Sequence, residues 1–313
     1  MLSVEHVTKV YRIGGFGLRK LTAVRDVTFD IGPGEIVSLI GESGSGKSTI
    51  GKLILRLTPI TSGTIRFEGT DISTLRGQAL KAYYRRVQGV FQDPFASYNP
   101  IFKADRIFSM VREEFFPGLD SRAWTEKVEG ALRAVGLNPP DVLGKFPHQL
   151  SGGQLQRFLI ARALLLDIRL LIADEIISML DASTRIDVLN LLADIKSRGL
   201  SILFITHDLS LGYYISERAI ILYNGTVVEM GPAQKVYESP RHPYTRMLMD
   251  SVPRLDRKWE RTRTELQRQL AEEDEGCIYY RRCPRGRGEC ARFAPQLVPV
   301  DDDHWVACFS AQR

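Results

Sequence analysis

A glycine-rich segment is the strongest chemical signal in the sequence: residues 41–48 read GESGSGKS, the spacing G-x-x-x-x-G-K-[ST] of phosphate-binding loops. The apolar residues 36–40 before it predict a strand, and the helical spacing of apolar residues in STIGKLILRL after it predicts a helix. Glycines let the backbone close on a phosphate at the helix N-terminus, where the dipole favours an anion. We expect Lys47 to reach the β- and γ-phosphates and Ser48 to bind Mg²⁺. The predicted nucleotide contacts here are Gly41, Ser43, Gly44, Ser45, Gly46, Lys47, Ser48 and Thr49.

Two adjacent acids, Asp174 and Glu175, end the apolar segment LLIADE. A pair of acids at a strand end is often only a helix cap. Beside a phosphate-binding loop, however, Asp174 is suited to hold magnesium through water, and Glu175 is suited to activate the attacking water. The two motifs together predict a P-loop nucleoside triphosphatase.

A third motif, LSGGQLQR at residues 150–157 with FPHQ before it, resembles the signature sequence of the ABC ATPase family. Its backbone N–H groups and serine hydroxyl stand at a predicted helix N-terminus, where they can contact a phosphate. The resemblance implies that this loop closes on the ATP of another subunit, so that the active site is shared across a dimer. The residues it assigns to ATP are Ser151, Gly152, Gly153 and Gln154.

Four further positions resemble functional positions of the same family, in the same order along the chain. Tyr11 resembles the aromatic residue that stacks on adenine, and Gln92 the glutamine that contacts magnesium and senses the membrane partner. Asp181 resembles the aspartate that communicates across the dimer, and His207 the histidine that contacts the γ-phosphate. Taken alone, Tyr11 also fits a packing residue of a β layer and His207 a buried histidine at a strand end. Because all these positions occur in the family's order within one chain, the functional interpretations are favoured. The resemblance then implies that Glu175, His207 and Lys47 are catalytic.

One position differs from the family pattern. The family usually has proline directly after the catalytic glutamate, whereas this chain has Ile176. The change adds a backbone N–H group and removes no catalytic group, so we expect activity to survive.

The order of elements predicts an α/β fold in which the resemblance implies a RecA-like core. The opening segments alternate with period two and predict an antiparallel β subdomain, whereas proline-broken helical segments predict an inserted helical subdomain at about 93–155. LLIADE and SILFITHD predict parallel strands joined by a helix, and Asn224-Gly225 predicts a type I′ hairpin. We expect an ABC nucleotide-binding domain over 1–235 and a small cysteine-containing extension over 236–313, with a charged helix in DRKWERTRTELQRQLAEEDE.

The sequence after about residue 237 resembles the C-terminal extension of oligopeptide and dipeptide importer ATPases. The resemblance rests on SPRHPYTRMLMDSVP, on GCIYYRRCP and on HWVAC. It implies an ATPase subunit that pairs with a second, equal or different, ATPase subunit beneath two transmembrane permease subunits, with a substrate-binding protein outside the cell. Related importers carry nickel or oligosaccharides, so the cargo remains a choice among these and peptides.

All four cysteines lie in this extension, with the spacing C-x5-C-x6-C-x17-C from Cys277 through Cys283 and Cys290 to Cys308. The spacing lacks the C-x2-C pair of structural zinc sites. Some members of the importer family hold a 4Fe-4S cluster here, and four thiolates suit one. A zinc ion and free thiols are the alternatives, because disulfides are uncommon in the cytosol. The arginines around the site predict a solvated basic loop or a contact with lipid headgroups: Arg281, Arg282, Arg285 and Arg287.

Composition and the pattern of apolar residues argue against a membrane-spanning protein and against a secreted one. Hydrophobic residues make up 44% and charged residues 25% of the chain, as in globular proteins, and no apolar run is long enough to span a membrane. The N-terminus lacks the apolar core of a signal peptide. We therefore expect the protein to stay in the cytoplasm. The resemblance implies a peripheral protein on the cytoplasmic face of the membrane, and we expect it not to bind nucleic acid. An ABC ATPase of DNA repair or translation, and a regulatory subunit with little hydrolysis, are the alternative functions.

Overall fold

The computed structural model describes residues 1–13, 19–251 and 276–312. The charged segment of residues 256–275, predicted to be a helix, lies outside them. In the part of the chain that is described, no helix has both the length and the apolar character needed to cross a membrane.

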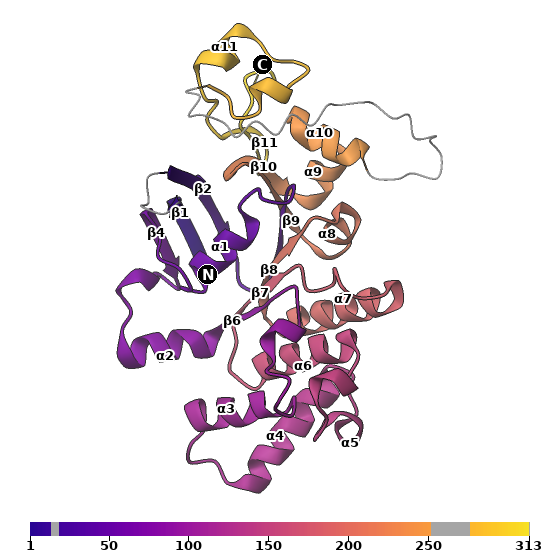
Figure 1. Cartoon of the computed structure of the whole chain (residues 1–313). Helices are drawn as coiled ribbons and strands as arrows, with labels where there is room; N and C mark the ends of the chain where they lie inside the picture. The colour runs from indigo at the N-terminus through magenta and orange to yellow at the C-terminus, as the bar shows by residue number, and fades with distance from the viewer. Residues whose placement is uncertain (14–18, 252–275, 313) are drawn as a thin grey trace.

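An eight-stranded sheet forms the centre of the molecule, with strand order β11-β12-β10-β9-β3-β8-β7-β6 (Figure 1). Its strands are β3 (Ile36–Ile40), β6 (Val87–Val90), β7 (Leu170–Asp174), β8 (Ser201–Thr206), β9 (Arg218–Tyr223), β10 (Thr226–Pro232), β11 (Val298–Asp301) and β12 (His304–Val306). Every residue of β3, β7 and β8 is buried, which fits their near-continuous apolar sequence and parallel pairing. Because β3 and β7 flank β8 in parallel, the segments that follow these three strands meet at one edge of the sheet.

The predicted antiparallel β subdomain is present as a second sheet, of order β2-β1-β4-β5. Its strands are β1 (Leu2–Ile13), β2 (Arg19–Ile31), β4 (Ser62–Phe67) and β5 (Thr70–Asp71). Their inward residues form one apolar core with α1 (Lys47–Ile54) and one face of the central sheet. The helix that follows the phosphate-binding loop is therefore held between two β layers.

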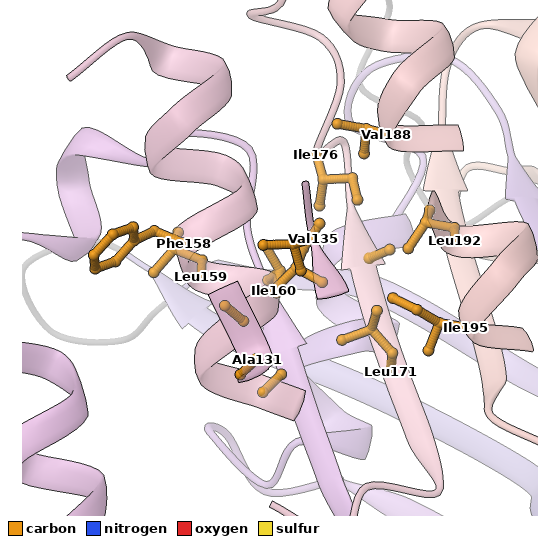
Figure 2. Packing of buried hydrophobic residues seen from close by; sticks show 14 of the residues in the cluster. Ala131, Val135, Phe158, Leu159, Ile160, Leu171, Ile176, Val188, Leu192 and Ile195 are labelled. Atoms are coloured by element: carbon orange, nitrogen blue, oxygen red, sulfur yellow. The ribbon is translucent and has the colours of Figure 1, made fainter. Parts of the chain in front are cut away.

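Helices α6 (Gly152–Leu164) and α7 (Ala182–Ser197) cover the other face. Helices α3 (Arg106–Phe115), α4 (Ser121–Ala134) and α5 (Pro139–Val142) lie beyond α6 and continue the same apolar core (Figure 1). Figure 2 shows Val135 and Ile160 packed near Leu171 of β7 and Leu192 of α7. Phe108 of α3 stacks on Phe158 of α6 with ring centroids 4.7 Å apart. The predicted inserted helices are thus joined by α6 to the strand that carries the two acids. Helix α2 (Gly77–Arg86) does not belong to this group and lies beside the β subdomain (Figure 1).

The predicted hairpin joins β9 to β10, and both central residues have positive φ, 43° at Asn224 and 82° at Gly225, as a type I′ turn requires. The turn also contacts the phosphate-binding loop. The Gly225 N–H group donates to the Ser45 carbonyl at 2.8 Å, and the Gly225 carbonyl accepts from Arg25 N at the same distance. The hairpin therefore supports the loop as well as reversing the chain.

The C-terminal extension continues the central sheet. Helix α8 (Leu209–Ile215) precedes β9, and α9 (Ala233–Glu238) leads from β10 into the extension. The extension contains α10 (Pro243–Asp250), α11 (Gly288–Arg292) and the hairpin of β11 and β12, and β12 pairs with β10. Glu229 of β10 is fully buried and accepts from the N–H groups of Arg241 and His242, at 2.7 and 2.9 Å. Nε2 of His304 lies 2.7 Å from the same carboxylate. One buried acid thus holds three separate segments together.

Replacing this acid tests its role in attaching the extension. Glu229→Ala leaves the buried His242 N–H group, the partly buried Arg241 N–H group and the buried His304 imidazole without their acceptor, so we expect a loss of about 3–5 kcal/mol in the free energy of unfolding. Urea denaturation measures the loss, and limited proteolysis should cut residues 276–312 first. Glu129→Ala, which removes an exposed ion pair in α4, serves as the control and should change stability by less than about 0.5 kcal/mol. Equal stability of the two variants would contradict the role of Glu229.

Candidate nucleotide-binding site

The phosphate-binding loop ends in a helix N-terminus that is open to an anion. Helix α1 begins at Lys47 after Gly46, whose φ of 103° and close approach to the Ala23 carbonyl, 2.4 Å from where a Cβ would stand, both require glycine. Among the described residues no side chain caps α1, and its first turn contains no acid. The N–H groups of this turn are therefore suited to bind a phosphate.

Lys47 is the buried cation of the loop. Its Nζ donates to the carbonyl oxygens of Gly41 and Glu42, at 2.8 and 3.0 Å. Burial lowers its pKa, and the nearby carboxylates of Glu175 and Asp174 oppose that shift. The amine is held at the inner side of the loop, among groups that favour its charged form, where phosphate oxygens can replace the carbonyl acceptors.

Ser48 and Asp174 form the candidate magnesium site. The Ser48 hydroxyl donates to Oδ1 of Asp174 at 3.0 Å, which brings the end of β7 against the start of α1. Burial raises the pKa of Asp174, the Ser48 hydrogen bond opposes this shift, and Glu175 adds to it. A hydroxyl and a carboxylate side by side are the oxygen ligands that Mg²⁺ takes, and a divalent cation would compensate the buried charge. The residues present therefore fit the metal.

Glu175 and His207 face each other across the ends of β7 and β8. Nδ1 of His207 lies 3.3 Å from Oε1 of Glu175, whose side chain is 17% exposed against 57% for the histidine. Glu175 has a left-handed backbone, with φ of 51°, and its N–H group donates to the Ile205 carbonyl at 2.9 Å. A non-glycine residue held in this conformation is a strain typical of functional sites. The pair has the arrangement of a base and a group that orients its water.

Ile176, which replaces the usual proline, is 1% exposed and belongs to the apolar core on the helical side (Figure 2). Its side chain therefore contributes to packing of the core. The expectation that activity survives this replacement stays a prediction.

The signature residues form a capped helix end within this chain. The Ser151 hydroxyl accepts from Gln154 N at 3.2 Å, and the Gln154 side chain accepts from Ser151 N at 2.8 Å. Asp181 caps α7 by accepting from Thr184, which lowers the Asp181 pKa together with the Ser183 hydroxyl. A Cβ on Gly153 would lie 2.6 Å from the Thr184 methyl group, so the two caps are close. Within the described parts of the chain, no hydrogen bond or ion pair joins Ser151, Gln154 or Asp181 to the phosphate-binding loop.

Gln92 and Tyr11 also lie outside the hydrogen-bonded group. Gln92 is exposed directly after β6, and Tyr11 is half-buried in β1 with Nζ of Lys9 4.8 Å from its ring centroid. Ser43 is exposed in the loop and Thr49 lies in the first turn of α1. The structure thus brings together the residues at the ends of β3, β7 and β8.

Sequence reasoning missed two contacts on the loop and was wrong about one arginine. Arg282 is not part of a solvated basic loop: its guanidinium donates to both carboxylate oxygens of Glu42, at 2.9 and 3.0 Å. The hydroxyl of Tyr244 accepts from Glu42 N at 3.0 Å. Arg282 and Tyr244 lie 240 and 202 residues from Glu42 in the sequence, so no local pattern could have revealed these contacts.

Family models match both parts of the chain: one described as "ABC transporter" matches residues 24–178, and one described as "Oligopeptide/dipeptide transporter, C-terminal region" matches residues 228–290. A protein of Brucella ovis, named provisionally as a peptide import ATP-binding protein, is 41% identical over 98% of this chain and 97% of its own length. This chain belongs to the ABC transporter ATP-binding proteins. The oligopeptide transport ATP-binding protein AppF of Bacillus subtilis is 39% identical over 98% of this ABC protein and 96% of AppF.

Solved structures agree with this assignment. The dimeric ATP-binding cassette MJ0796, in a post-hydrolysis state bound to ADP and Pi, superposes with a TM-score of 0.67 and 28% identity. The match covers 74% of this ABC protein and 99% of that chain. The predicted α/β fold is confirmed, and the ABC protein is an ATPase subunit of an importer. The second family model begins at residue 228, ahead of the expected boundary at 236, which fits the continuation of the sheet from β10 into β12.

The buried carboxylate of Asp174 gives a prediction that separates stability from activity. Because burial raises its pKa above 3.8, the ionised form costs stability at neutral pH, and the cost disappears as the pH falls toward 3.8. We expect nucleotide-free Asp174→Asn to melt at a higher temperature than the natural protein at pH 7, with a difference that shrinks in acid. Magnesium-dependent ATP hydrolysis should fall at least about 100-fold.

Thermal melting from pH 4 to 8 and a phosphate-release assay measure the two effects. Asp167→Asn, at an exposed carboxylate just before β7, is the control and should leave both unchanged. An Asp174→Asn protein that is less stable at neutral pH and still active would contradict the assignment.

Proposed function

We propose that this ABC protein hydrolyses ATP to drive the uptake of peptides, with an oligosaccharide or nickel as the alternative cargo. The observation that carries the proposal is the meeting of a buried lysine, a serine–aspartate pair and a glutamate–histidine pair at the ends of three parallel strands. Relatives named for peptide and oligopeptide transport, matched over nearly their whole length, support the peptide cargo. They favour transport over DNA repair, translation or a purely regulatory role.

The proposed roles follow from the positions of the side chains. The N–H groups of the loop and Lys47 would hold the β- and γ-phosphates of ATP, while Ser48 and Asp174 would hold Mg²⁺ with Gln92. Magnesium supplies charge neutralisation on the phosphate oxygens. Glu175 would accept the proton of the attacking water, and His207 would orient that water beside the γ-phosphate.

The remaining nucleotide contacts are proposed to come from a second ATPase subunit. Ser151, Gly152, Gly153 and Gln154 stand at the N-terminus of α6, where they can close on a phosphate held by another chain, and Asp181 lies beside them. Tyr11 would stack on the adenine of its own subunit. The dimeric, ADP-bound cassette MJ0796 supports a shared site.

The membrane partners are proposed to be two permease subunits, fed by a substrate-binding protein outside the cell. Several large apolar side chains are exposed between residues 95 and 110, where an apolar partner surface would cover them. They are Phe95, Ile101, Phe102 and Met110. This segment directly follows Gln92, so a partner bound there could be sensed at the magnesium site. The protein would then act at the cytoplasmic face of the membrane.

Replacing the proposed base tests the mechanism. Glu175→Gln keeps the shape of the side chain but cannot accept a proton, so we expect turnover to fall about 10²- to 10⁴-fold while ATP still binds. Because ATP then persists between subunits, size-exclusion chromatography with ATP should show more dimer than the natural protein. Glu126→Gln, at an exposed acid of α4, is the matched control. Natural turnover in Glu175→Gln, at saturating ATP and Mg²⁺, would reject the assignment.

We further propose that the extension of residues 236–313 holds a structural 4Fe-4S cluster, next to an ABC domain of residues 1–235 with its helical subdomain at about 93–155. The four cysteines line one small cavity together with Tyr279 and Tyr280. Burial raises the pKa of the Cys277 and Cys283 thiols. In the described part of the chain, no three His, Cys, Asp or Glu residues are grouped closely enough for one metal ion. The cavity that the four cysteines share is the observation that supports one common site for them.

The cluster proposal predicts a colour. Protein prepared without oxygen should be brown with broad absorbance near about 400 nm, and Cys283→Ser should remove the colour and expose the extension to protease. ATP binding through Lys47 should persist. Ser310→Ala, on the same cavity, is the control that keeps the colour. A colourless anaerobic preparation with one zinc per chain, or with no metal, would contradict the cluster.

A further inference from the structure

Two residues of the extension, Arg282 and Tyr244, contact Glu42 of the phosphate-binding loop. Arg282 binds both carboxylate oxygens of Glu42, in the bidentate geometry that makes arginine–carboxylate pairs specific. Tyr244 accepts the hydrogen bond of the Glu42 N–H group at 3.0 Å. Glu42 directly follows Gly41, the first residue of the loop, so both its side chain and its backbone are fixed by chain that lies more than 200 residues further on.

Aromatic rings hold the arginine in place. Its guanidinium lies 5.7 Å from the ring centroid of Tyr223 and 5.9 Å from that of Tyr279. Tyr244 is fully buried and packs against both rings, with centroids 4.7 and 5.5 Å away. The Glu42 carboxylate holds the pKa of Arg282 above its ordinary value. The ion pair therefore ends a packed cluster and is not a mobile surface contact.

Glu42 connects these contacts of the extension to Lys47, the proposed catalytic lysine. The Glu42 carbonyl oxygen accepts from Nζ of Lys47 at 3.0 Å, so the position of this peptide group sets one of the two acceptors that hold the amine. The Glu42 carboxylate is also one of the charges that act on Lys47. Without a partner, this carboxylate would add an uncompensated negative charge to a loop that must accept phosphates.

We propose that Arg282 is a positioning residue for nucleotide binding: it neutralises and anchors Glu42, so that the ATP affinity of the subunit depends on its C-terminal extension. The inference rests on the proposed nucleotide site. Through Arg282, the extension would contribute to ATP binding. Arg282 immediately precedes Cys283, one of the four cysteines of the cavity, so the site of the cysteines and the contact with Glu42 are adjacent in the chain. Arg282 acts through Glu42 and does not itself contact the substrate.

A double-mutant cycle on the full-length chain separates this role from general stabilisation. We expect Arg282→Gln to raise the Kd of a fluorescent ATP analogue about 3- to 10-fold, in line with a partly buried ion pair that also sets loop geometry. In a Glu42→Gln background, the same substitution should change the Kd less than about 2-fold, because the charge to be neutralised is gone. The Kd of Arg282→Lys should lie between that of the natural protein and that of Arg282→Gln. With the partner subunits present, the effect should appear in KM and leave kcat within about 2-fold.

Arg292→Gln, an exposed arginine of α11 in the same extension, is the matched control and should bind as the natural protein does. Thermal melting establishes that each variant is folded. An Arg282→Gln protein with unchanged Kd, or with the same loss in both backgrounds, would overturn the proposal, as would a loss of kcat alone. Lys47→Ala distinguishes the two levels: natural affinity in that variant would refute the nucleotide site itself, whereas lost affinity there with an unaffected Arg282→Gln would refute only the positioning role.

Discussion

Parallel pairing of β3 and β7 with β8 is the constraint on which the rest of the structure depends. It places the phosphate-binding loop, the two acids and His207 at one sheet edge although they lie far apart in sequence. Parallel strands are stable only when both faces are covered, and here the antiparallel β subdomain covers one face and helices α6 and α7 the other. The inserted helices pack on α6 and so reach the sheet through it.

The electrostatics of the site follow from that burial. A lysine and an aspartate that are taken from water resist ionisation, and the fold compensates them only in part, with two carbonyl oxygens for Lys47 and one hydroxyl for Asp174. In the proposed site, phosphate oxygens and a divalent cation would add counter-charges to both groups. The binding of nucleotide would then stabilise the loop.

Local patterns were enough to predict the elements that form this edge. The strand, loop and helix around Lys47, the buried strand before Asp174 and the Asn224-Gly225 turn each carry their signal within a few residues. Contacts between distant segments carry no such signal. Three such contacts depend on how the chain returns to the sheet after α10: the pairing of β12 with β10, the hydrogen bonds to Glu229, and the ion pair of Arg282 with Glu42. Neither the periodicity nor the spacing of residues predicts that return. The cysteine spacing predicted a shared site but not its occupant.

The addition of β11 and β12 also changes the border of the central sheet. Without them, β10 would present unpaired N–H and C=O groups along an apolar strand, a surface that pairs readily with other chains. With them, the border is β11, a strand of four residues that contains Pro299 and ends at Asp301. Proline cannot donate a hydrogen bond and an exposed acid repels a partner, so the outermost strand is a poor template for intermolecular pairing. The hairpin of β11 and β12 thereby replaces an open apolar strand of the sheet with one that resists pairing with other chains.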